Sequence, residues 1–99
     1  PAVLRLIKAA CDGASPHGRP VGVCGEAAAD PALAVVLVGL GVASLSMTAR
    51  ALPDVDAVLK SVDLADCQRL AGLATSARTA DDARGAVRAE LPILEELGL

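Results

Sequence analysis

Two short apolar segments with a helical pattern between them constrain the fold of this chain more than any other feature of its sequence. The segments are PVGVCG (residues 20–25) and VASLSM (residues 42–47). Both are predicted to be short buried strands, and the first has the β-branched composition of a strand that is covered on both faces of a parallel sheet. The order strand–helix–strand with short loops predicts parallel pairing and a right-handed crossover.

The uncharged run between these strands is predicted to be a helix that stops before the second strand. Asp30–Pro31 is a strong helix start, because Asp caps free amides and Pro suits the first turn. Gly39 or Gly41 then provides a left-handed cap. Residues 31–49 carry no charge and are long enough to cross a bilayer. Glycines and serines interrupt that run, so a helix followed by a buried strand explains it better than a membrane span.

An amphipathic helix is predicted before the first strand, over about residues 2–15, and Pro16 and Gly18 end it. Its predicted apolar face consists of Val3, Leu6, Ile7, Ala10, Cys11 and Ala14.

More helices are predicted after the second strand. Asp63 caps one of them, Thr79 and Asp82 resemble a capping box for the last, and Pro92 is expected to kink or divide that last helix. The predicted apolar faces are Val55, Val58, Leu59 and Val62 before Asp63, and Leu64, Cys67, Leu70 and Ala71 after it.

Two strands are too few for a stable parallel sheet, because such sheets need further strands and helices on both faces. We therefore expect an α/β fold that is part of a larger one. Residues 1–99 form one partial domain in this interpretation, with strand–helix units over 1–62 and C-terminal helices over 63–99. An open strand edge is a template for pairing, so we also expect a homo-oligomer.

The composition argues against nucleic acid as a partner. The chain has no Phe, Tyr or Trp on which bases could stack, and its formal net charge is −3. The arginines of the last third are interleaved with acidic residues, which is typical of solvated helix faces. These arginines are Arg69, Arg78, Arg84 and Arg88, and the acidic residues are Asp66, Asp81, Asp82 and Glu90.

The three cysteines, Cys11, Cys24 and Cys67, have no spacing typical of a disulfide framework or a zinc site. With no signal-peptide pattern in the sequence, they predict a protein of the reducing cytoplasm. Cys11 and Cys67 lie on apolar helix faces and are predicted to be core residues. Cys24 lies between glycines at a strand end instead.

Residues 21–53, VGVCGEAAADPALAVVLVGLGVASLSMTARALP, resemble the C-terminal part of the phosphoenolpyruvate (PEP)-binding barrel of PEP-utilising enzymes. The resemblance is strongest to the phosphoenolpyruvate–protein phosphotransferases, the enzyme I family of the bacterial sugar phosphotransferase system. Thr48 departs mildly from the family pattern, which often has Ser there. The matching residues are Gly22, Val23, Cys24, Gly25 and Glu26, followed by Gly39, Leu40, Gly41, Ser46 and Met47.

The resemblance implies that the chain holds the last two strands of a TIM (β/α)8 barrel with their helices. Such barrels need about 250 residues. Family members transfer the phosphoryl group of PEP to a histidine on a separate N-terminal domain, and from there to a phosphocarrier protein. The family also uses Mg²⁺, whose ligands we do not find in this chain, and its barrel domain forms a dimer.

Cys24 falls at the carboxyl end of its predicted strand, where barrel enzymes place their chemistry. No Lys, Arg or His lies between Pro20 and Ala49 to stabilise a thiolate, and Glu26 with an anionic substrate favours the thiol. A thiol can protonate the enolate of pyruvate. The local chemistry and the resemblance therefore both predict Cys24 to be the general acid/base, although a buried strand-end cysteine would give the same pattern.

Four further residues are predicted to contribute to substrate binding. Gly22 and Gly25 leave room for substrate to approach, Glu26 orients the loop, and Ser46 lines the pocket. A solvated carboxylate at Glu26 and an ordinary strand end at Ser46 are the simpler alternatives. His17, the only histidine, lies in a loop at the opposite end of the strand and is predicted to be a surface residue.

Other functions remain compatible with this sequence. The chain could come from a pyruvate phosphate dikinase or a PEP synthase, or it could be a self-associating structural module. A membrane-associated helix at 31–49 is a third alternative. In every enzymatic interpretation we expect the isolated 99-residue chain to be inactive.

Overall fold

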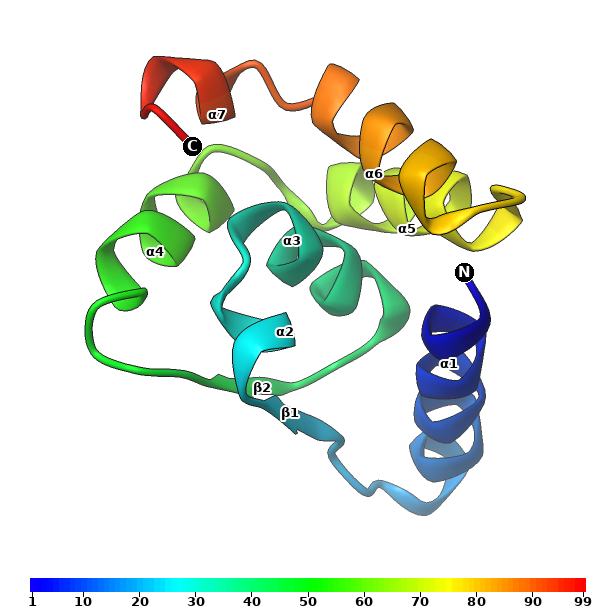
Figure 1. The fold of residues 1–99 in the computed structure, drawn as a ribbon. Helices are drawn as coiled ribbons and strands as arrows, with labels where there is room; N and C mark the ends of the chain where they lie inside the picture. Colours follow the sequence, from blue (N-terminus) through cyan, green and yellow to red (C-terminus); the bar gives the residue numbers. More distant parts are fainter.

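The computed structural model describes all residues from Pro1 to Leu99 as a helix-dominated fold with one two-stranded sheet (Figure 1). The elements before the second strand are α1 (Ala2–Ala14), a 3₁₀ turn (Ser15–His17), β1 (Gly22–Cys24), α2 (Glu26–Ala29) and α3 (Pro31–Leu40). Then follow β2 (Ser44–Ser46), α4 (Leu52–Lys60), α5 (Leu64–Ser76), α6 (Ala80–Ala89) and α7 (Ile93–Glu96).

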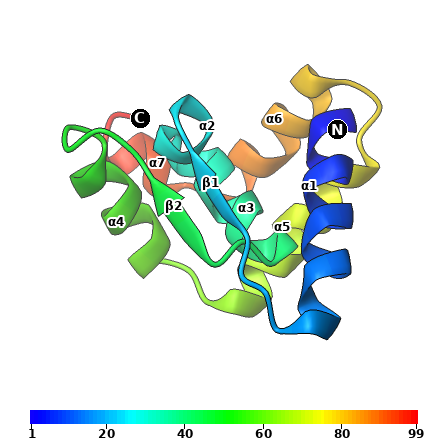
Figure 2. The ribbon, with the colours of Figure 1, turned by 90° about the horizontal axis from the view of Figure 1, so that it is seen from below.

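The two strands pair in parallel, as the sequence predicts. Gly22 lies opposite Ser44, and Cys24 lies opposite Ser46. Seen from below, the strands lie in front of the helices, which cover only one face of the sheet (Figure 2). The predictions of a first strand buried on both faces and of a buried second strand are therefore wrong for this chain: only the central residue of each strand is half-buried, and its neighbours are exposed.

Helix α3 forms the centre of the core and packs chiefly against α5. Val35 and Leu37 are fully buried, because nearly every position of this helix is apolar and neighbours surround it. Gly39 sits where α3 crosses α5: a Cβ there would lie 2.0 Å from the carbonyl oxygen of Cys67. Gly39 thus lies inside the helix and permits the close crossing.

The predicted ends of α3 are confirmed. The Asp30 carboxylate accepts hydrogen bonds from the amides of Ala32 at 3.0 Å and Leu33 at 3.3 Å. Gly41, with φ of 106°, provides the left-handed cap. No helix of the chain combines the length and the apolar character that a membrane crossing requires.

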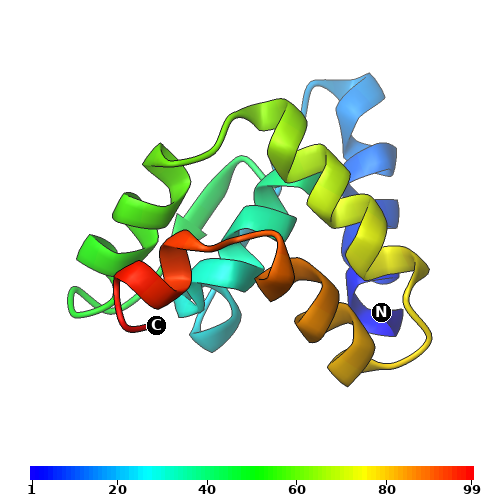
Figure 3. The same cartoon turned by 90° about the horizontal axis from the view of Figure 1, so that it is seen from above.

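The C-terminal helices cover the side of α3 opposite the sheet, as the view from above shows (Figure 3). Asp63 and Asp66 form a reciprocal capping box at the start of α5. Thr79 accepts from the amide of Asp82 at 3.0 Å, which is half of such a box. Pro92 separates α6 from α7, in agreement with the predicted division.

The predicted apolar face of α1 needs correction. Val3 and Leu6 are 68% and 72% exposed, whereas Leu4, Ile7 and Cys11 pack against the core. The reason is that α1 has neighbours on one side only, namely α3 and α5. Leu64, at the start of α5, is likewise 59% exposed, so its assignment to the apolar face is also wrong. The short helix α2 is an element that the sequence pattern did not indicate.

Candidate functional site

Cys24 and Ser46 lie side by side at the carboxyl ends of the two strands. They are partners in the parallel register, and the amide of Gly25 donates a hydrogen bond to the carbonyl oxygen of Ser46 at 3.1 Å. The pairing therefore continues one residue past Cys24 and fixes the backbone at this point. The structure brings together the two strand ends from which the predicted site residues come.

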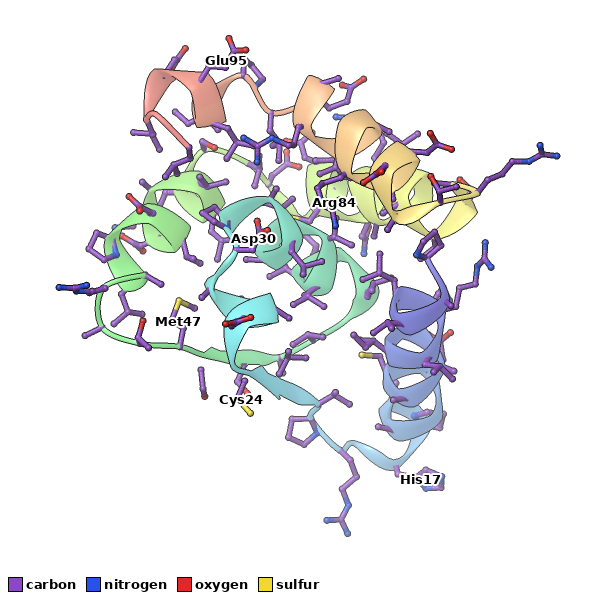
Figure 4. The ribbon with its side chains drawn as sticks, in the orientation of Figure 1. His17, Cys24, Asp30, Met47, Arg84 and Glu95 are labelled. Carbon is purple, nitrogen blue, oxygen red and sulfur yellow. The ribbon has the colours of Figure 1, made fainter.

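The side chains at this end divide between the two faces of the sheet. Alternate residues of a strand point to opposite sides, and register partners point to the same side. Val23 and Leu45 pack against the helices, so Cys24 and Ser46 point away from them. Figure 4 shows the Cys24 side chain directed away from α3 and that of Met47 on the helix side of its strand. We call this uncovered side, formed by Gly22, Cys24, Ser44 and Ser46, the open face.

Gly25 and Glu26 form the turn from β1 into α2. Gly25 has a φ of 94°, while a Cβ there would meet no atom within 4 Å. Backbone conformation therefore requires glycine at this position, because other residues are strained there. Glu26 is exposed in the first turn of α2, and the four ion pairs of the chain join other residues.

Gly22 has a close neighbour on the adjacent strand. A Cβ at Gly22 would lie 2.6 Å from the hydroxyl oxygen of Ser44. In this chain the missing side chain makes room for Ser44, a residue that sequence reasoning did not single out. The strand register is the signal that would have revealed it, because it sets Gly22 and Ser44 opposite one another.

The three thiols are free, and they have different environments. Cys24 is exposed, whereas Cys11 and Cys67 are buried, which confirms the prediction that those two are core residues. Burial raises the pKa of the Cys67 thiol, and the carboxylates of Asp66 and Asp63 raise it further. Burial, followed by the charge of Asp12, likewise raises the pKa of Cys11. Cys24 is therefore the thiol that solutes reach in the folded chain.

Cys24, Gly25 and Glu26 are exposed and lie outside the three main surface cavities of this chain. Three surface cavities of about 270, 240 and 290 Å³ lie between helices or beside β2. None of these three is lined by Cys24, Gly25 or Glu26, although Ser44 lines the third, which lies between β2 and α4. Any enclosed pocket around Cys24 would need walls from outside these 99 residues.

The residues present do not fit a magnesium site. No three His, Cys, Asp or Glu side chains lie close enough together to hold a metal ion. His17 is exposed in the 3₁₀ turn, as predicted for a surface residue. The charges of the C-terminal helices form surface ion pairs, Arg69 with Glu90 at 3.2 Å and Arg84 with Asp81 at 2.8 Å, as predicted for solvated helix faces.

Comparison with known proteins assigns a family to residues 1–64, which match the model of the PEP-binding domain of PEP-utilising enzymes. The chain is 52% identical over 91 residues to a phosphoenolpyruvate-protein phosphotransferase of Streptomyces coelicolor, covering 92% of the chain and 16% of that protein. It is 49% identical over 84 residues to a multiphosphoryl transfer protein of Xanthomonas campestris, covering 85% and 10%. A phosphoenolpyruvate-protein phosphotransferase of Haloferax volcanii is 48% identical over 71 residues, covering 72% and 13%. The match thus spans between 10% and 16% of the length of these relatives.

Proposed function

Because this chain belongs to the PEP-utilising enzyme family, we propose that it forms the last two strand–helix units of a PEP-binding (β/α)8 barrel in a phosphoenolpyruvate–protein phosphotransferase. The observation that carries the proposal is the placement of Cys24 beside Ser46, at parallel strand ends and on the open face. In barrel enzymes the helices surround the strands, and the active site lies at the carboxyl ends of the strands. The open face would then look into the barrel.

In the proposed reaction Cys24 is the general acid. The phosphoryl group leaves PEP for a histidine on a domain outside this chain, from which it passes to a phosphocarrier protein. The leaving group is the enolate of pyruvate. Its double-bond electron pair takes the thiol proton of Cys24: a C–H bond forms at the methylene carbon, the S–H bond breaks, and its electron pair stays on sulfur. The exposed thiol of Cys24 supports this role.

The neighbours of Cys24 have distinct parts in the proposal. The Ser46 hydroxyl contacts substrate beside the thiol, and Gly22 and Gly25 shape the surface from which the thiol approaches it. Glu26 orients the turn from β1 into α2 beside the thiol. The groups that bind the phosphate and carboxylate of PEP, and any Mg²⁺, come from the rest of the barrel, so no step here involves a metal.

The proposal also covers the setting of the protein. The free cysteines suit a reducing cytoplasm. Two of the relatives named above are phosphoenolpyruvate-protein phosphotransferases and the third is a multiphosphoryl transfer protein, which favours this function over a dikinase or a PEP synthase. The open strand edges and the exposed Val3 and Leu6 favour a second candidate, a self-associating module, for the chain on its own. A homo-oligomer is compatible with both functions.

A chimera tests the proposal. This chain replaces the matching segment of the Streptomyces coelicolor relative, and pyruvate release from PEP is measured with the phosphocarrier protein present. We expect an active chimera and an inactive isolated chain. Cys24→Ala should slow pyruvate release by about 100-fold or more, the usual contribution of a general acid. Gln68→Ala, on the exposed side of α5, is the matched control and should have no effect.

A second measurement isolates the proton transfer. Exchange of the methyl protons of pyruvate in D₂O, followed by NMR, should require Cys24 in the chimera. A folded chimera without activity, or a Cys24→Ala chimera that releases pyruvate at an undiminished rate, would contradict the proposed function.

A further inference from the structure

A hollow of about 240 Å³ lies between the N-terminal part of α1, the first turns of α3 and α6. Helix α1 packs against α3 and α5, and its N-terminal end lies near α6 without packing closely against it (Figures 1 and 3). No residue of the open face lines this hollow. It is therefore a second candidate site, separate from the one around Cys24.

Short side chains keep this hollow open. Ala32, Ala74 and Ala83 line it at buried positions of α3, α5 and α6, and none of them extends beyond Cβ. The buried side chains of Val36 and Val87 add further apolar surface. An engineered apolar cavity of about 150 Å³ binds benzene. This hollow therefore has room for an apolar group somewhat larger than one benzene ring.

Two arginines of α6 bring positive charge to the hollow. Arg84 and Arg88 both line it, and their spacing of four residues places them on one face of the helix. Arg84 donates to the carboxylate of Asp81 at 2.8 Å, but this pair is exposed and such pairs are weak in water. Arg88 donates to the carbonyl oxygen of Leu99 at 2.6 Å. A guanidinium has five N–H donors, so both arginines retain donors for an anion.

Asp30 is the one carboxylate among the residues that line the hollow. Asp30 and Arg84 come from the start of α3 and from α6 (Figure 4). The Asp30 carboxylate already accepts hydrogen bonds from the amides of Ala32 and Leu33. It also lies at the positive end of the α3 dipole, which offsets its charge. Two guanidinium groups thus face one capped carboxylate, and this balance favours an anionic ligand.

We propose that this hollow binds a small apolar carboxylate. The apolar body of the ligand lies against Val36 and Val87, and its carboxylate accepts hydrogen bonds from Arg84 and Arg88. An apolar wall with a few convergent polar groups is the usual composition of a small-molecule site. This binding site is independent of the proposed function, because it requires neither PEP nor Cys24.

Phenylacetate is a suitable probe, because it combines one benzene ring with a carboxylate. The chain has no aromatic residue, so in an NMR titration every ring-current shift of its methyl resonances comes from the probe. We expect saturable shifts of the Val36, Ala83 and Val87 methyl groups, with a Kd on the order of 1 mM for a ligand of this size. The methyl groups of Val58, in α4 and outside the hollow, should not shift.

A neutral analogue of the probe tests the role of charge. The alcohol 2-phenylethanol has the same ring and should bind about three- to tenfold more weakly, the loss expected for an exposed charge-assisted hydrogen bond. Added salt should weaken the binding of phenylacetate more than that of the alcohol, because salt screens exposed charges.

Substitutions then locate the site. Arg84→Gln and Arg88→Gln should each weaken phenylacetate binding about two- to fivefold and leave the Kd of the alcohol unchanged. Arg78→Gln removes an equal charge just before α6 but outside the hollow, so this matched control should keep the parent Kd. Ala83→Leu fills the hollow and should abolish binding of both probes. The two arginines are exposed, so their variants carry the test if Ala83→Leu fails to fold.

The proposal is overturned if phenylacetate causes no saturable methyl shift in the millimolar range. Equal Kd values for phenylacetate and 2-phenylethanol overturn it as well, and so does a Kd that Arg84→Gln and Arg88→Gln leave unchanged. None of these measurements involves PEP or the chimera, so failure of this site and failure of the proposed function are separate results.

Discussion

The two faces of the β1–β2 sheet differ in what they contribute to this molecule. On the covered face, Val23 and Leu45 pack against a core centred on α3. On the open face, the side chains are a thiol and two hydroxyls, with no aliphatic group among them. The same strands thus supply apolar packing on one side and reactive or polar groups on the other. Because alternate residues point to opposite faces, substitutions can probe stability and chemistry separately.

The small size of the open-face residues has a further meaning in the proposed barrel. The interior of such a barrel is usually filled by branched residues such as Val, Ile and Leu. Glycine, cysteine and serine leave that volume free. If these strands line a barrel, the space in front of them can admit a small substrate.

The largest change in the free energy of unfolding is expected from a substitution in the core that covers one face of the sheet. Gly39→Ala places a methyl group 2.0 Å from the Cys67 carbonyl oxygen, so α3 and α5 must separate. We expect a loss of about 3 kcal/mol in the free energy of unfolding. Gly72→Ala, at an exposed position of α5 with open space around it, should instead stabilise the chain by about 0.5–1 kcal/mol. Urea denaturation followed by circular dichroism measures both, and equal effects would contradict the close crossing.

A smaller contrast is expected between the two faces of β2. Leu45→Ala removes a half-buried side chain from the core and should lower the free energy of unfolding by about 1–2 kcal/mol. Ser46→Ala, one residue along on the open face, should change it by less than about 0.5 kcal/mol. Thermal unfolding of the two variants tests this directly. A larger loss from Ser46→Ala would mean that the open face is packed in solution.

Loss of the N-terminal cap of α5 should lower the free energy of unfolding by no more than the loss expected for Leu45→Ala. Asp63→Ala removes the carboxylate that accepts from the Asp66 amide at 2.8 Å, and should lower the free energy of unfolding by about 1 kcal/mol. Asp56→Ala breaks only the surface ion pair with Lys60 and is the matched control, with no measurable change expected. The urea midpoints of unfolding measure the stability of both variants. Equal midpoints for Asp63→Ala and Asp56→Ala would argue against a stabilising cap at Asp63.

The smallest effect is expected in how the free energy of unfolding changes with pH under alkaline conditions. Burial raises the pKa of Cys67 above its ordinary value of 9.0. The folded chain therefore keeps this proton at a pH where the unfolded chain has lost it, and the free energy of unfolding falls as pH rises above about 9. Cys67→Ala should reduce that slope relative to the parent chain, while Cys11, whose pKa is also raised by burial, continues to contribute. Unfolding titrations between pH 7 and pH 10 test it, and equal slopes would contradict the burial of Cys67.

The sequence predicted local structure well where one residue decides it. Asp30, Asp63 and Pro92 each act on neighbouring backbone, and each element boundary they predict is confirmed. Burial was harder to predict, because it depends on which neighbours exist. The exposed Val3 and Leu6 follow a correct helical period, yet no element covers that side of α1.

The candidate site shows the same division. The motif around Cys24 indicated the strand end and the thiol, and the structure places Ser46 beside it. Ser44 was missed because its relation to Gly22 arises from strand register, which brings together residues that are distant in sequence.

The position of α3 between two paired strands also sets an order of events during folding. Gly22 can meet Ser44 only after the intervening chain has closed a loop, and loop closure costs entropy before strand pairing compensates for it. Helix α3, capped locally at Asp30, can form without either long-range contact. The arrangement of the thiol and its neighbouring hydroxyls, in contrast, exists only once the segment between the two strands has closed on itself.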